Sequence, residues 1–170
     1  KRMVEYLIGT GRKRIAILCA KETDESIGSL RLEGYRQALA GKKIPEDPKL
    51  ILRPETEHTY SYENGYRCIK KLIESGVPFD CVYAISDTIA IGALRALHDC
   101  GKKVPDDVAV AGFDGIDAVR YTVPSLTTLK QPDQEMARET VDALFEQLQH
   151  TDAPKRHKLF QGELIRGEST

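Results

Sequence analysis

Short apolar runs alternate along this chain with longer stretches in which apolar residues recur at helical spacing. The runs at 15–19, 81–85 and 108–113 are almost wholly apolar, which is typical of strands covered on both faces of a sheet. The stretches between them carry apolar stripes that end at glycines, as helices do. Because strands and helices alternate in this way in parallel βαβ units, we predict the α/β class, with a parallel sheet flanked by helices. The expected strands are 15–19, 49–52, 81–85, 108–113, 126–129 and 159–165, and the expected helices are 3–8, 30–40, 62–75, 88–100 and 133–149.

The length and the charge balance narrow the possible partners. The chain has 170 residues, 41% of them hydrophobic and 30% charged, which is enough for one domain with a buried core. Its 25 Lys and Arg are balanced by 26 Asp and Glu, so the chain lacks the basic excess that binds a phosphate backbone. No apolar run reaches the roughly 20 residues that cross a bilayer. We therefore expect neither DNA nor a membrane to be bound by this segment directly.

The cysteines and histidines argue against metal and catalytic sites. The four cysteines lie far apart without a C-x-x-C pair, which is typical of reduced thiols in a cytoplasmic protein. The four histidines are scattered, and none follows a buried strand beside an acid and a nucleophile. The sequence also lacks a Gly-rich phosphate loop, a G-x-S-x-G elbow and an H-E-x-x-H motif. We expect no catalytic residue, no metal and no cofactor.

Polar side chains stand where the expected strands end. Asp87 follows one strand, Asp114 ends another, and Arg31 lies one loop beyond the first. Because ligands of open parallel sheets bind at the carboxyl ends of the strands, these three side chains can face a common crevice. Carboxylates accept from vicinal hydroxyls and a guanidinium donates in a fixed fork, while Tyr60, Tyr62 or Phe113 could cover an apolar sugar or base face.

Each of these residues also has a plainer interpretation. An acid at a strand-to-helix junction, such as Asp87, is more often a helix cap than a ligand contact. Arg31 at a helix start is as readily a surface charge. Spacing alone leaves both alternatives open.

Three segments stand out along the chain, namely SDTIAIGAL at 86–94, VPDDVAVAGFD at 104–114 and PSLTTLKQP at 124–132. In order and spacing they resemble successive signatures of the LacI/GalR family of bacterial transcription repressors. Weaker matches, GRKRIA at 11–16, RLEGY at 31–35 and RGEST at 166–170, extend the resemblance over nearly the whole chain. Each motif alone is modestly specific, but together they are strong.

The resemblance implies the fold of type I periplasmic binding proteins, in which an effector binds between two α/β subdomains. Residues 1–130 would be the C-terminal subdomain, 131–158 a segment that crosses to the N-terminal subdomain, and 159–170 the returning strand and tail. The DNA-reading helix-turn-helix and most of the N-terminal subdomain would lie outside this chain. The helix at 133–149 should then carry an apolar face, formed by Met136, Val141, Leu144 and Leu148, whose natural cover is missing.

The resemblance also assigns roles to five positions. Arg31 matches the arginine that clamps the effector, Asp114 the acid that accepts from sugar hydroxyls or base nitrogens, and Tyr60 the aromatic residue that stacks on the ligand. Ser86 and Asp87 are the other two residues expected at the site, with Asp87 at least partly a helix cap. Ser86 falls where many sugar-binding members carry Asn, and a hydroxyl has one donor where an amide has two.

These observations predict the effector-binding and dimerising part of a LacI-type regulator, which is cytoplasmic and not an enzyme. The small-molecule effector would be a sugar or a related compound, the chain would form a homodimer, and DNA would be bound only through the N-terminal domain. The alternative is a periplasmic sugar-binding protein of a transport system, against which stand the unpaired cysteines and the repressor-like LTT stretch at 126–128. An enzyme on the same sheet is a third possibility, without a site to support it.

Overall fold

The protein forms a six-stranded sheet with the order β2-β1-β3-β4-β5-β6. The computed structural model describes residues 1–21, 27–54, 58–150 and 157–170. The first five strands in this order are parallel, and β6 runs antiparallel to β5. The strands are β1 (Ile15–Leu18), β2 (Ile51–Leu52), β3 (Cys81–Ala84), β4 (Ala109–Asp114), β5 (Thr127–Lys130) and β6 (Glu163–Ile165). The predicted α/β class with a mostly parallel sheet is confirmed.

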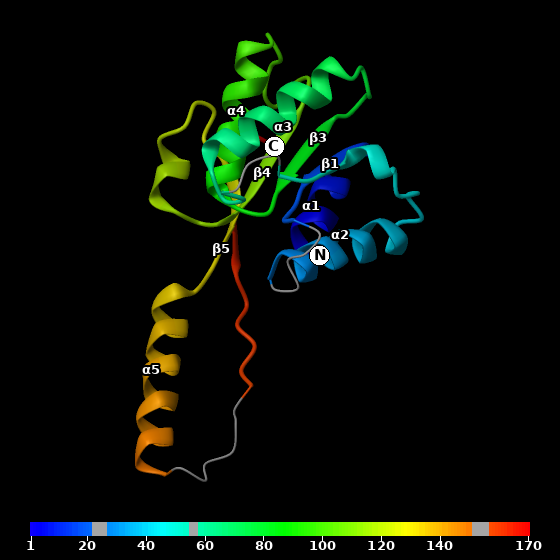
Figure 1. Cartoon of the computed structure of the whole chain (residues 1–170). Coiled ribbons are helices and arrows are strands. Elements are labelled where there is room, and N and C mark those ends of the chain that lie inside the picture. Colours follow the sequence, from blue (N-terminus) through cyan, green and yellow to red (C-terminus); the bar gives the residue numbers. More distant parts are fainter. Residues whose placement is uncertain (22–26, 55–57, 151–156) are drawn as a thin grey trace.

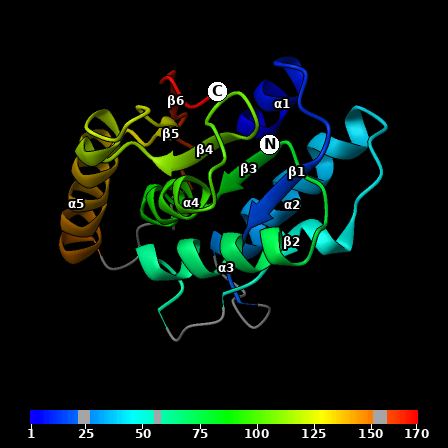
Figure 2. The same ribbon diagram turned by 90° about the horizontal axis from the view of Figure 1, so that it is seen from above.

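Helices cover both faces of this sheet (Figures 1 and 2). α1 (Arg2–Gly9) and α2 (Ile27–Gly41) lie on one face, and α3 (Tyr62–Glu74) and α4 (Asp87–Asp99) lie on the other. Two short 3-10 helices, η1 (Pro48–Leu50) and η2 (Asp117–Arg120), complete this part of the chain. The central strands β1 and β3 are buried along their whole length, as strands covered on both faces must be.

The pair α3 and α4 packs closely because each helix has a glycine at the contact. A Cβ atom on Gly65 would lie 2.0 Å from the carbonyl oxygen of Ile89, and one on Gly92 would lie 1.9 Å from that of Tyr62. Any side chain at either position would force the helices apart. This contact supports the first turn of α4, which forms part of the site described below.

Three predicted boundaries differ from the structure. The first half of the expected strand 49–52 belongs to η1, because the side chain of Asp47 accepts from the Lys49 N–H and Pro48 begins a helical turn, and only Ile51 and Leu52 form the strand. The expected strand 159–165 pairs only from Glu163 onward, and Leu159 is 97% exposed. α2 begins at Ile27, three residues before the start of the helix expected at 30–40. None of these differences changes the order of the strands.

The helix α5 (Asp133–Gln149) projects away from the sheet (Figure 1). None of its 17 residues is buried, and three of the four apolar residues expected on its open face are exposed, whereas Met136 is only partly exposed. Exposure is 49% for Val141, 55% for Leu144 and 70% for Leu148, and Phe145 joins the same surface at 59%. In the described part of the chain, no helix is both long and apolar enough to cross a membrane.

Candidate functional site

The site begins where β3 ends and α4 starts. Ser86 is the N-cap of α4, and its hydroxyl accepts from the backbone N–H of Ile89 at 3.3 Å. Such a cap satisfies a helix N–H that would otherwise lack a partner. Ser86 is 3% exposed, so its hydroxyl serves the helix rather than facing solvent.

The neighbouring Asp87 is fully buried and accepts three hydrogen bonds. Its Oδ2 accepts from the backbone N–H groups of Gly115 at 2.6 Å and Ile116 at 3.0 Å, and its Oδ1 accepts from the hydroxyl of Thr128 at 2.6 Å. Burial raises the pKa of this carboxyl, against the opposing effect of these donors. Asp87 is therefore not the helix cap that its position suggested, because Ser86 has that role. Its carboxylate binds the turn after β4 instead.

That turn contains a strained residue. Asp114, the last residue of β4, has a φ of 124°, and Gly115 after it has a φ of 79°. Residues other than glycine rarely adopt positive φ, and such strain persists only where the surroundings hold it in place. The two backbone N–H groups that donate to Asp87 belong to Gly115 and Ile116, the residues directly after the strained one. They fix the turn that presents the Asp114 side chain at the carboxyl end of the sheet.

Arg31 of α2 reaches the same point from the other side of β3. Its NH1 donates to the carbonyl oxygen of Ile85 at 2.5 Å, and its NH2 lies 3.7 Å from Oδ1 of Asp114. The guanidinium also stacks on the ring of Phe113, 4.0 Å from the ring centre. The Arg31 side chain is only 13% exposed, so it is not the surface charge that spacing alone allowed.

The electrostatics of this cluster follow from its burial. Burial raises the pKa of Asp114, while the charge of Arg31 and a hydrogen bond from Gln131 act in the opposite direction. Burial likewise raises the pKa of Tyr83, in β3 beneath the cluster, to about 12. A carboxylate that is part-buried beside a fixed guanidinium is a strong acceptor for a hydroxyl or an N–H group.

A cavity of about 360 Å³ opens beside Asp114. It is lined by residues of the β4 turn and of the junction between β5 and α5, namely Asp114, Gly115, Ile116, Gln131, Asp133 and Met136. Gln131 donates from its side-chain amide to Oδ1 of Asp114 at 2.7 Å. This volume lies at the lower end of what small-molecule sites have.

The structure brings four of the five predicted site residues together. Arg31 and Asp114 are in contact, and Ser86 and Asp87 lie directly behind them. Tyr60 is 46% exposed just before α3, and the contacts of Arg31 and Asp114 with described residues do not include it. Sequence reasoning missed Gln131 and Thr128, although both stand in the LTTLKQP motif.

Metal chemistry finds no support among the described residues. In the ranges 1–21, 27–54, 58–150 and 157–170, no group of three or more His, Cys, Asp or Glu side chains could hold a metal ion. The cluster at the end of β4 contains a guanidinium, two carboxylates, an amide and an aromatic ring. These groups bind polar organic molecules through hydrogen bonds and stacking.

Comparison with known proteins gives consistent results. The model of the periplasmic binding protein-like domain matches residues 4–170. The HTH-type transcriptional regulator MalR of Clostridium butyricum is 36% identical over 99% of this chain and 48% of its own length. The chain thus spans about half the length of the curated relatives it matches. These relatives are transcriptional regulators, not enzymes.

Solved structures give the same picture. A sugar-binding transcriptional regulator of the LacI family from Escherichia coli, complexed with phosphate, is 36% identical with a TM-score of 0.87, over 99% of this chain and 59% of that one. The complex of the transcriptional regulator CelR with cellobiose is 30% identical with a TM-score of 0.89, over 98% of this chain and 50% of that one. The sheet and helices described above are therefore shared with these regulators.

Proposed function

The chain belongs to the periplasmic binding protein-like domains and, within them, to the LacI-type transcriptional regulators, and on this premise we propose that it is the effector-binding and dimerising part of such a regulator. The effector is a sugar or a sugar derivative. The observation that carries the proposal is the contact between Arg31 and Asp114 at the carboxyl end of the sheet.

The chemistry of the contact suits a polyhydroxyl ligand. Asp114 offers an acceptor, Arg31 offers guanidinium N–H donors, and the ring of Phe113 beneath Arg31 adds an apolar surface. Vicinal hydroxyls can donate to the acid and accept from the guanidinium at the same time. Within this proposal Arg31 and Asp114 touch the ligand, Tyr60 covers it, and Ser86 and Asp87 act from behind by fixing α4 and the turn.

The proposal extends to the parts of a regulator that lie outside this chain. Residues 1–130 form the C-terminal subdomain, 131–158 cross to an N-terminal subdomain, and 159–170 return to the sheet. Two such chains form a homodimer, and DNA is bound through an N-terminal domain, so the protein works in the cytoplasm. Effector binding between the subdomains changes the relation between the two DNA-binding domains.

A thermal-shift screen tests the effector class. The protein is heated with sugars, polyols, nucleosides and purine bases in turn, and a ligand at 100 times its dissociation constant adds about 2.7 kcal/mol to the free energy of unfolding. We expect a sugar to stabilise the wild type and to lose this effect in Arg31→Ala. Stabilisation by a sugar that persists in Arg31→Ala would place the binding site elsewhere, and stabilisation only by a purine base would refute the sugar class.

A further inference from the structure

Both side-chain partners of the Asp114 carboxylate use the same oxygen. The amide of Gln131 donates to Oδ1 at 2.7 Å, and NH2 of Arg31 lies 3.7 Å from Oδ1. No side chain in the described ranges donates a hydrogen bond to Oδ2. Among the described side chains, therefore, only Oδ1 has a hydrogen-bond donor, and the backbone N–H of Asp87 also acts on the carboxylate.

Gln131 is the partner that fixes the carboxylate. A separation of 3.7 Å is too long for a hydrogen bond, so Arg31 attracts the acid without setting its rotation. Of the described side chains, only Gln131 lies within hydrogen-bond distance of this carboxylate. Asp114 itself is strained in its backbone, with a φ of 124°, and its side chain is 28% exposed. The backbone N–H of Asp87 also restrains this carboxylate, and Gln131 adds the side-chain donor that sets its rotation.

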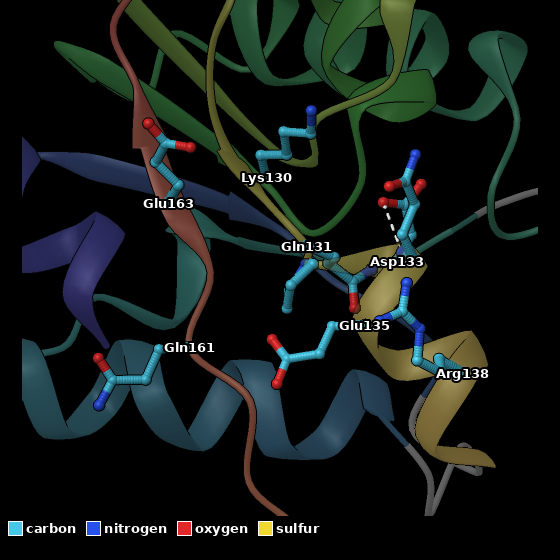
Figure 3. Close-up of a pocket in the computed structure, with 9 residues that line it drawn as sticks. Lys130, Gln131, Asp133, Glu135, Arg138, Gln161 and Glu163 are labelled. Atoms are coloured by element: carbon cyan, nitrogen blue, oxygen red, sulfur yellow. Dashed lines mark hydrogen bonds between the residues drawn. The ribbon is translucent and has the colours of Figure 1, made fainter. Parts of the chain in front are cut away.

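The backbone holds Gln131 in the right place for this role. Its N–H donates to the carbonyl oxygen of Asp114 at 3.0 Å, which continues the pairing of β4 with β5 by one residue. Figure 3 shows Gln131 at the junction where β5 leads into α5. Because two hydrogen bonds join the same two residues, the amide has little freedom to turn away.

We propose that Gln131 is a positioning residue of the effector site, whose amide fixes the Asp114 carboxylate so that Oδ2 faces the ligand. The inference rests on the proposed function, and it predicts which kind of ligand group can face Asp114. An oriented Oδ2 requires a hydroxyl or N–H donor on the ligand at this point, because a ligand acceptor there would leave two acceptors facing each other.

The first test needs no ligand. The carboxyl of Asp114 is titrated by carbon-13 NMR in the wild type and in Gln131→Lys, Gln131→Leu and Gln131→Glu. A cation lowers the pKa of a neighbouring acid, loss of a donor raises it, and a second carboxylate raises it further. We expect the pKa of Asp114 to rise in the order Lys, Gln, Leu, Glu. Gln134→Leu, the same change three residues later on the exposed first turn of α5, should leave it unchanged.

The second test measures binding of cellobiose and ribose as probes. If either sugar binds the wild type, Gln131→Leu should weaken the binding about tenfold, at a temperature where the variant is still folded. A pKa of Asp114 that does not respond to the residue at 131 overturns the inference, as does unweakened sugar binding in Gln131→Leu. If the order of pKa values holds but no sugar binds the wild type, the positioning role stands and the sugar proposal fails.

Discussion

The carboxylate of Asp87, at the start of α4, accepts a hydrogen bond at 2.6 Å from the hydroxyl of Thr128 in β5. The two residues are 41 positions apart, and β4 lies between β5 and β3, the strand that leads into α4. Through its second oxygen, Asp87 also binds the turn that follows β4. One buried acid therefore joins a helix start, a turn and a strand around Asp114.

Thr128→Val tests this connection through stability. Valine has the shape of threonine without the hydroxyl, so the buried Asp87 loses one of its hydrogen-bond donors. We expect the free energy of unfolding, measured by urea denaturation, to fall by about 1–3 kcal/mol. The exposed Asp106→Asn serves as the control and should stay within about 0.5 kcal/mol of the wild type. A loss in Thr128→Val as small as that of the control would mean that the bond does not stabilise the fold.

Arg31→Lys separates charge from geometry at the site. Lysine keeps the positive charge but lacks the planar fork that bonds Ile85, approaches Asp114 and stacks on Phe113. We expect sugar binding, measured by calorimetry, to weaken about tenfold or more. The matched control is Arg36→Lys, in the same helix, whose guanidinium is 45% exposed and pairs with Glu46. Equal affinities of Arg31→Lys and the wild type would show that only the charge matters.

The pKa of Asp114 predicts how stability depends on pH. Burial raises this pKa above its ordinary value of 3.8, although Arg31 and Gln131 oppose the shift and the nearby Asp87 adds to it. Between the ordinary and the raised pKa the folded chain binds more protons than the unfolded chain, so the free energy of unfolding falls as pH rises through this window. Below both values the contribution is fully present.

Asp114→Asn removes this dependence. The free energy of unfolding of the variant minus that of the wild type should therefore be more positive at about pH 7 than at about pH 3.5. Urea denaturation at the two pH values measures the difference, and Asp87, which is present in both proteins, largely cancels. A difference that is constant or that decreases towards pH 7 would mean that the folded state does not raise the pKa of Asp114.

More of the fold than of the candidate site could be predicted from the sequence. Runs of apolar residues identified the strands, because a strand buried on both faces of a sheet is apolar along its length. Glycines marked the ends of the helices. The sequence placed Asp114 at the end of one strand and Arg31 one loop beyond another, and the structure shows them in contact. It could not distinguish Ser86 from Asp87 as the cap, because both residue types cap helices. Gln131 stayed unnoticed, because its role depends on pairing between β4 and β5.

Because the apolar face of α5 is exposed, we expect polar substitutions on it to change the stability of this chain very little. Leu144 and Leu148 are 55% and 70% exposed, so their replacement by glutamine removes little buried apolar surface. We expect Leu144→Gln/Leu148→Gln to keep the free energy of unfolding of this chain within about 0.5 kcal/mol and to bind less of a dye specific for apolar surfaces. Leu94→Gln in α4, where leucine is 8% exposed, is the destabilising control. A loss of stability in the α5 variant similar to that of the control would contradict the exposure of this face.

Amide chemical-shift mapping tests the central claim most directly. Nitrogen-15-labelled protein is titrated with the sugar that stabilises it most, and the shifted amides are assigned along the chain. The account predicts that the largest shifts cluster at the ends of β3 and β4, at 85–87 and 113–116, and around Arg31 and Gln131. Large shifts confined to the β2 edge or to the middle of α5, with none at Asp114, would contradict it.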